Sequence, residues 1–178
     1  MSYNEYQRRL ASWSDIVDHL PRLYQEACRD NVVVIELGVR SGNSTAAFMA
    51  AAEEHDGHVW SVDIEECSGP WGERWTFIQG DDMDVIDQLP ECDVLFVDSS
   101  HHYDHTLAEL KAYVPKVKDG GVVLLHDSEL EVPYMCPPDD PPFPVTAALR
   151  TFLALTDPEA QVEWVSGCNG LAVYRKGC

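Results

Sequence analysis

The sequence predicts an α/β fold in which a mostly parallel sheet is closed by an antiparallel hairpin. Short apolar runs of the kind that form buried strands alternate with segments of helical periodicity, an order that favours a parallel sheet covered by helices on both faces. The first of these runs leads into a glycine turn and a helix start. The last two runs flank residues 167–170, GCNG, which is a turn signal typical of a hairpin.

The N-terminal segment, residues 1–30, is expected to form helices. Residues 3–29 have helical character, and Ser14 is a candidate N-cap for SDIVDHL. Pro21 then begins or kinks a second helical piece, because proline is tolerated only in the first turn of a helix. We expect this segment to pack on the sheet.

Residues 32–44, VVVIELGVRSGNS, organise the rest of the chain. Residues 32–35 make a continuous apolar run, as expected of a central parallel strand, and Glu36 stands at its carboxyl end. Gly38 and Gly42 flank a tight turn. Ligands of open parallel sheets bind just outside the carboxyl ends of the strands, so a small molecule is expected here.

The helix that follows this turn is expected over residues 45–53, with Ser44 as its N-cap. The further predicted elements are strands at 58–63, 75–79, 93–97, 122–125, 161–165 and 171–174, and helices at 83–89, 105–114 and 145–155. No internal repeat or domain boundary is visible, which predicts one domain over residues 1–178.

The proline-rich stretch at residues 128–145 interrupts this regular pattern. A loop of this length inside a compact domain is usually functional or disordered. It carries Tyr134, Met135 and Phe143, and we interpret it as a candidate lid over the ligand.

Composition excludes several classes of function. The chain of 178 residues has 12 basic and 31 acidic residues, a net charge of −19, which argues against a nucleic-acid partner. No apolar run approaches the roughly 20 residues of a membrane span, and MSYNEYQRRL lacks the apolar core of a signal peptide. The six cysteines form no C-x-x-C pair, which indicates free thiols in a reducing cytoplasm rather than a zinc cluster.

Acidic residues end four of the predicted strands: Glu36, Asp63, Asp98 and Asp127. Buried carboxylates are costly unless they are paired, so this pattern favours binding roles over packing. Glu36 precedes the first glycine, where it would repel a pyrophosphate and suit a ligand that carries an ammonium group. Asp63 suits the two hydroxyls of a ribose, and the alternative is a solvated acid at a strand end.

Asp98, His126 and Asp127 end adjacent predicted strands and are candidate ligands of one hard cation. Carboxylates favour Mg²⁺, and a histidine in the set shifts the preference toward Mn²⁺. The alternative is that Asp127 caps a turn and His126 is a core histidine. His101 and His102 follow Asp98 and are candidate general bases, since an imidazole exchanges a proton near neutral pH; a polar loop role is the alternative.

The block DVLFVDSSHHYDHTLAELKAYVPKVKDGGVVLLHDS, together with VIELGVRSGNSTAAFMAA, HVWSVDIEE and NGLAVYRK, resembles class I S-adenosylmethionine-dependent methyltransferases. The similarity is to the cephalosporin hydroxylase-like and macrolide sugar O-methyltransferase group and covers residues 32–176. It implies a Rossmann-like sandwich with a seven-stranded, mostly parallel sheet and an antiparallel C-terminal hairpin.

The resemblance also implies roles for single residues. It assigns Asp98 and Asp127 as metal ligands and His101 as the catalytic base. His102 is the alternate base, and His126 is a further candidate metal ligand. His126 departs from the family pattern, which often has an acid there. The cofactor-binding residues that it implies are Glu36, Gly38, Gly42, Ser44, Asp63, Gly80, Asp81 and Asp98. Asp81 would meet the adenine amino group, with Asp82 as an alternative, and either acid could instead cap the next helix.

The function expected from these observations is O-methylation of a small hydroxylated molecule, with S-adenosylmethionine and a divalent metal, Mg²⁺ or Mn²⁺, as cofactors. A homo-oligomer without nucleic-acid or membrane partners is expected. Two alternatives stay open: a metal-dependent hydroxylase or hydrolase that uses the same Asp/His cluster, and a non-catalytic binding module.

Overall fold

The computed structural model of the protein describes residues 2–131 and 139–177. Its strands form one seven-stranded sheet in the order β3-β2-β1-β4-β5-β7-β6. The strands are β1 Val33–Leu37, β2 His58–Asp63, β3 Trp75–Gln79, β4 Cys92–Val97, β5 Val117–His126, β6 Val162–Val165 and β7 Leu171–Arg175. β1 to β5 pair in parallel, whereas β7 pairs antiparallel with both β5 and β6. The expected fold class is therefore confirmed.

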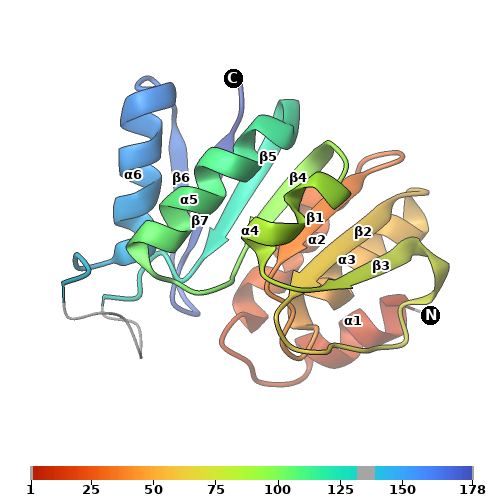
Figure 1. Ribbon diagram of the computed structural model, residues 1–178. Coiled ribbons are helices and arrows are strands. Elements are labelled where there is room, and N and C mark those ends of the chain that lie inside the picture. Colours follow the sequence, from red (N-terminus) through yellow and green to blue (C-terminus); the bar gives the residue numbers. More distant parts are fainter. Residues whose placement is uncertain (1, 132–138, 178) are drawn as a thin grey trace.

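Helices cover both faces of this sheet, as Figure 1 shows. The α-helices are α1 Ser2–Leu10, α2 Leu20–Ala27, α3 Asn43–Glu54, α4 Asp82–Val85, α5 Tyr103–Tyr113 and α6 Pro144–Thr156. Short 3₁₀ turns lie at η1 Val17–His19, η2 Gly72–Arg74, η3 Ile86–Gln88 and η4 Val114–Lys116. α1, α2 and α3 cover one face, and α4, α5 and α6 cover the other.

The core has two halves because successive strand residues point to opposite faces. Val34 and Phe96 pack with the α1–α3 side, whereas Ile35 and Leu95 pack with the α5–α6 side. All four side chains have an exposed fraction of 0%. Burial on both faces explains why the central strands read as continuous apolar runs and not as alternating ones.

The N-terminal helices differ from the prediction. Residues 11–16 do not form the helix expected behind a Ser14 cap, so that prediction is wrong. The hydroxyl of Ser12 donates to the carbonyl of Arg8 at 3.0 Å at the end of α1, and Asp15 pairs with Arg40 at 2.8 Å. Polar side chains of this kind compete for backbone groups and favour turns over helix interiors. Pro21 does stand in the first turn of α2, as expected.

The start of α3 also differs. Gly42, with a φ of 74°, is the N-cap residue, and α3 begins at Asn43. Ser44 is therefore inside the first turn and is not the predicted cap. Its hydroxyl donates to a buried carboxylate oxygen of Glu36 at 2.6 Å, whereas a cap would accept a hydrogen bond from a backbone amide.

Two element boundaries also differ from the prediction. β5 begins at Val117 and includes Gly120-Gly121, which were expected as a preceding turn. The predicted helix at 83–89 is divided into α4 and η3. Of the candidate lid, Tyr134 and Met135 lie outside the described residues, while Phe143 precedes α6 and is 39% exposed.

None of the helices in the described ranges is long and apolar enough to cross a bilayer.

Candidate active site

The carboxyl ends of the parallel strands meet at one edge of the sheet. The parallel pairing of β1 with β4 continues to its end, since the amide of Asp98 donates to the carbonyl of Leu37 at 2.8 Å. On the other side of β1, the amide of Gly38 donates to the carbonyl of Val62 at 2.9 Å. These bonds bring the segments after β1, β2 and β4 together, where ligands of such sheets bind.

Gly38 allows the turn after β1 to press against the end of β4. Its φ is +89°, and a Cβ atom added there would lie 2.1 Å from the carbonyl oxygen of Asp98. No real side chain tolerates such a distance. The turn that carries the predicted cofactor-binding glycines is therefore held directly beside Asp98.

Asp63 ties this turn to the end of β2. Its Oδ2 atom accepts hydrogen bonds from the amides of Val39 at 2.8 Å and Arg40 at 2.9 Å, and its Oδ1 atom accepts from the amide of Glu65 at 2.9 Å. Burial raises the pKa of Asp63, but the amide donors outweigh it and the pKa is lowered. The carboxylate is thus ionised, partly exposed and fixed in orientation at the rim of the glycine turn.

Glu36 lies beneath the turn and not at its surface, with an exposed fraction of 0%. Three hydroxyls donate to its carboxylate: Ser44 at 2.6 Å, Thr45 at 2.9 Å and Ser61 at 2.5 Å. Burial raises the pKa of Glu36 to about 7, although these hydroxyl donors oppose the rise. Among the described residues Glu36 thus connects β1, β2 and α3, and its predicted contact with the cofactor stays a prediction.

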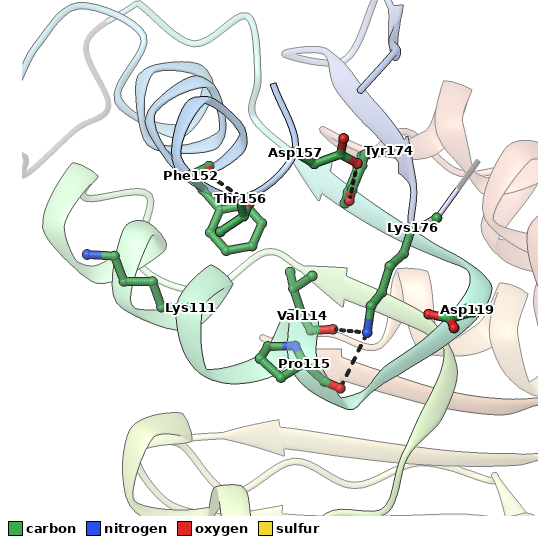
Figure 2. Close-up of a pocket in the computed structure, with 10 residues that line it drawn as sticks. Lys111, Val114, Pro115, Asp119, Phe152, Thr156, Asp157, Tyr174 and Lys176 are labelled. Atoms are coloured by element: carbon green, nitrogen blue, oxygen red, sulfur yellow. Dashed lines mark hydrogen bonds between the residues drawn. The ribbon is translucent and has the colours of Figure 1, made fainter. Parts of the chain in front are cut away.

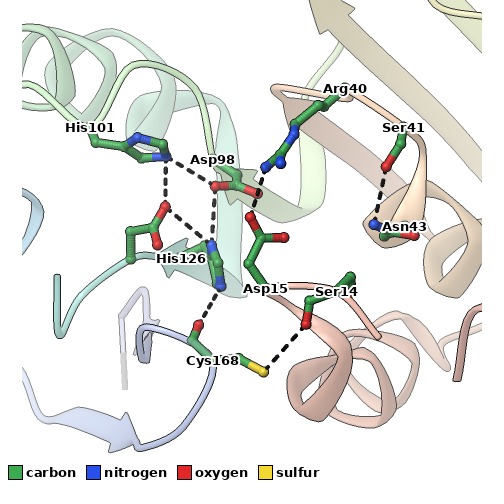
Figure 3. Close-up of polar contacts among 10 residues, drawn as sticks. Ser14, Asp15, Arg40, Ser41, Asn43, Asp98, His101, His126 and Cys168 are labelled. Atoms are coloured by element: carbon green, nitrogen blue, oxygen red, sulfur yellow. Dashed lines mark hydrogen bonds and ion pairs between the residues drawn. The ribbon is translucent and has the colours of Figure 1, made fainter. Parts of the chain in front are cut away.

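Two carboxylates and two imidazoles converge where β4 and β5 end, as Figure 3 shows for Asp98, His101 and His126. His101 Nε2 lies 2.7 Å from Asp127 Oδ2 and 3.3 Å from Asp98 Oδ1. His126 Nδ1 lies 3.2 Å from Asp98 Oδ1 and 3.3 Å from Asp127 Oδ2. The structure therefore brings the three predicted metal ligands together and adds the predicted base to the same cluster.

Mutual attraction sets the protonation states of this cluster. Burial lowers the pKa of His101, but its hydrogen bonds to Asp127 and Asp98 raise it to about 9. Burial likewise lowers the pKa of His126, and the same two acids raise it well above its ordinary value. Burial raises the pKa of Asp127, yet the two imidazoles bring it below its ordinary value. Positive charge at this place is strongly favoured.

The geometry of the cluster is suited to a metal ion. Asp98, His101 and Asp127 each offer a ligand atom, and these atoms lie within 4.8 Å of one another. Asp127 Oδ1 is buried and accepts no hydrogen bond within the described residues. His101 and Asp127 also have left-handed backbones, with φ of 56° and 58°, and strained backbone of this kind concentrates at functional sites.

Other predicted site residues lie outside this cluster. Asp81 is exposed and caps α4 by accepting from the amide of Met83 at 2.9 Å, which was the alternative to an adenine contact. Gly80 donates its amide to the carbonyl of Asp63 at 2.9 Å. The ring of His102 faces Asp140 at 3.5 Å. Of the two candidate bases, the structure places only His101 against Asp98 and Asp127.

The sequence predicted the C-terminal hairpin but not its contact with His126. His126 Nε2 donates to the carbonyl of Cys168 at 2.8 Å, which leaves Nδ1 facing the two acids. The acceptor is a backbone carbonyl in the turn between β6 and β7, so no side-chain pattern could have revealed this hydrogen bond. Arg40 was missed as well; it pairs with Asp15 at 2.8 Å beside the cluster (Figure 3).

A pocket of about 430 Å³ lies at the opposite end of the strands, between α5, α6 and the start of β5 (Figure 2). Lys111 and Lys176 are its basic side chains, and Lys176 already donates to the carbonyls of Val114 at 3.2 Å and Val117 at 2.5 Å. Because parallel sheets bind their ligands at the carboxyl ends of the strands, this pocket is not the candidate site.

Comparison with known proteins gives a family and several structural neighbours. A sequence model described as a methyltransferase domain matches residues 35–128, which run from within β1 past the end of β5 and include Asp98, His101, His126 and Asp127. No curated protein matches the chain.

Among solved structures, MycE, a methyltransferase from the mycinamycin biosynthetic pathway in complex with Mg, SAH and mycinamycin VI, is 20% identical with a TM-score of 0.72. The match covers 99% of this chain and 54% of MycE, so the chain spans about half of that protein. The O-methyltransferase NovP is 18% identical with a TM-score of 0.66, over 91% of this chain and 81% of NovP. SAH-bound PaMTH1 from Podospora anserina is 17% identical with a TM-score of 0.62, over 98% and 87%. At these identities the shared property is the fold.

Proposed function

The chain belongs to the methyltransferase domain family, with the class I S-adenosylmethionine-dependent fold, and from this premise we propose that it methylates a hydroxyl oxygen of a small molecule with the help of a divalent cation. The observation that carries the proposal is the cluster of Asp98, His101, His126 and Asp127 directly beside the glycine turn. Two ionised acids beside a predicted methyl-donor site suit a metal-bound hydroxyl acceptor.

The proposed cofactor site is the turn of residues 38–42 with Asp63 at its rim. S-Adenosylmethionine would supply the methyl group on its sulfonium. Asp63 is ionised and held by three amides, so it presents lone pairs in a fixed direction to a ribose. Glu36 acts in this proposal through Ser44 and Thr45, which anchor the start of α3. We propose it as a positioning residue.

The proposed acceptor site is the cluster itself. A divalent ion held by Asp98 and Asp127 would orient the acceptor hydroxyl and lower its pKa. The same positive charge would favour the neutral form of His101. His101 is the proposed proton acceptor, because the other candidate, His102, faces Asp140. With a pKa of about 9 in the absence of an ion, His101 carries a proton at neutral pH, so the roles of metal and base depend on each other.

The proposed substrate class is a small hydroxylated molecule, preferably one with two adjacent oxygens that can chelate an ion. Two neighbours support it by their descriptions: MycE is seen with Mg and mycinamycin VI, and NovP is described as an O-methyltransferase. The net charge of −19 disfavours anionic acceptors that lack a metal partner.

The test is a methyl-transfer assay with methyl-labelled S-adenosylmethionine and a panel of catechols, sugars and macrolide glycosides, each run with Mg²⁺, with Mn²⁺ and with a chelator. Labelled methyl ethers that form only with a divalent ion support the proposal. Transfer that is equally fast in chelator, or that goes only to amine or carbon acceptors in a parallel panel, would contradict it.

A further inference from the structure

A second cluster of ionisable side chains lies between α4 and α5. His105 Nε2 is 3.1 Å from Asp82 Oδ2 and 3.7 Å from Glu109 Oε1. His105 and Glu109 are four residues apart, so they share one face of α5, and Asp82 begins α4. Each of the three residues offers one ligand atom, and these three atoms lie within 4.8 Å of one another.

This cluster is more deeply buried than a surface ion pair. The Glu109 side chain has an exposed fraction of 0%, and that of Asp82 is 11%. His105 is 28% exposed and gives the cluster a path to solvent. Buried acids of this kind require compensation, because removing two carboxylates from water is costly.

The compensation within the described residues is incomplete. Glu109 Oε2 and Asp82 Oδ1 are both buried, and neither accepts a hydrogen bond from a donor there. Burial, together with the charge of Asp82, raises the pKa of Glu109 to about 8, so Glu109 carries a proton at neutral pH when no cation is bound. The unused oxygen atoms suit a cation, which would displace that proton.

Neighbouring hydroxyls hold the Glu109 side chain and the Asp82 backbone in place. Ser99 Oγ donates to Glu109 Oε1 at 2.5 Å, and Tyr113 donates to the backbone carbonyl of Asp82 at 2.5 Å. A site whose ligands are fixed by further hydrogen bonds loses less entropy when an ion binds.

We propose that Asp82, His105 and Glu109 form a second divalent-cation site, separate from the cluster at Asp98 and Asp127. One imidazole nitrogen and two carboxylates match a transition ion of the Zn²⁺ type, with a fourth position open to water through the exposed side of His105. An ion there would join α4 to α5. Through Ser99 it would also stiffen the segment that follows Asp98. This site does not depend on the identity of the methyl acceptor.

The test is equilibrium dialysis of the full chain against Zn²⁺ with elemental analysis. Asp98→Asn with Asp127→Asn serves as the parent, so that the first cluster does not contribute. We expect the folded parent to retain one equivalent of Zn²⁺, and His105→Gln or Glu109→Gln in that parent to weaken binding roughly 10-fold or more. His55→Gln is the matched control, because His55 is 27% exposed and pairs with Asp30 elsewhere on the surface; it should bind like the parent.

Circular dichroism establishes that each variant is folded, and melting with and without Zn²⁺ gives a second readout, since an ion that binds the native state raises the melting temperature. A folded parent that retains no Zn²⁺, or equal retention by the parent, His105→Gln and Glu109→Gln, would overturn the proposal. A proton held between Asp82 and Glu109 would then be the remaining compensation. Failure of methyl transfer alone would leave this result unchanged, so the two proposals are tested separately.

Discussion

His101 Nε2 lies 2.7 Å from Asp127 Oδ2, and the two residues come from the ends of adjacent strands with left-handed backbones at both positions. This contact unites two roles that the sequence assigned to different residues, proton acceptor and metal ligand. It also explains the high pKa of His101, since Asp127 and Asp98 both favour the charged ring.

His101 is predicted to matter far more than its neighbour His102. His101→Gln should lower kcat roughly 100-fold or more, because it removes the proposed proton acceptor. The matched control His102→Gln removes a ring that faces Asp140 and should have a much smaller effect. Single-turnover rates at saturating cofactor measure both. Equal losses in the two variants, or a larger loss in His102→Gln, would move the base away from His101.

Asp127→Asn is predicted to weaken the response to divalent cations. The variant loses one of the two charged oxygen ligands, so affinity for Mg²⁺ or Mn²⁺ should fall roughly 10-fold or more, and methyl transfer should fall with it. Cofactor affinity should be unchanged. Asp140→Asn is the control, since Asp140 contacts His102 outside the cluster. Half-maximal cation stimulation at the same ion concentration in Asp127→Asn and the wild type would show that the ion binds elsewhere.

Protonation of Glu36 is predicted to make the free energy of unfolding depend on pH. Its folded pKa of about 7 lies above the ordinary value of 4.5, so the folded state binds the proton more tightly than the unfolded chain. The stability that this proton provides is complete below pH 4.5 and is lost as the pH rises through 7. The loss amounts to about 3 kcal/mol in the free energy of unfolding.

Glu36→Gln isolates this effect because glutamine does not titrate. The free energy of unfolding of the variant minus that of the wild type should rise by about 3 kcal/mol between pH 4 and pH 8. Urea denaturation at several pH values measures it. Parallel curves for the two proteins would mean that Glu36 has an ordinary pKa.

Gly38→Ala is predicted to be more damaging than a glycine substitution elsewhere. Gly38 and Gly72 have φ values of +89° and +73°, so alanine is strained at both, at a cost of about 1 to 2 kcal/mol. At Gly38 the new Cβ would also meet the Asp98 carbonyl at 2.1 Å, whereas nothing lies within 4 Å at Gly72. Thermal melts of Gly38→Ala and Gly72→Ala compare the two, and equal destabilisation would contradict this close approach.

The strands were predictable because their signals are local. The apolar runs and the residues that follow them located β2 and β3 to the residue, and the convergence of Asp98, His126 and Asp127 followed from the parallel order alone. Such predictions need only the knowledge that strands in one sheet end at one edge.

The misplaced features depend on contacts between distant segments. A serine near a helix start resembles a cap, and only the burial of Glu36 shows that the Ser44 hydroxyl is used otherwise. The spacing of His105 and Glu109 on one helix was visible in the sequence, but Asp82 joins them only through the packing of α4 on α5. Ser14 does not act as a cap, because its buried hydroxyl has no hydrogen-bond partner among the described residues and Ile16 is the N-cap residue of η1.

The most direct test of the account is calorimetric titration of S-adenosylmethionine into the purified chain, with and without Mg²⁺, for the wild type and Asp63→Ala. We expect binding by the wild type and loss of binding in Asp63→Ala, because that carboxylate orients the glycine turn and faces the proposed ribose position. Absence of binding in the folded wild type, or full binding in Asp63→Ala, would contradict the proposed cofactor site.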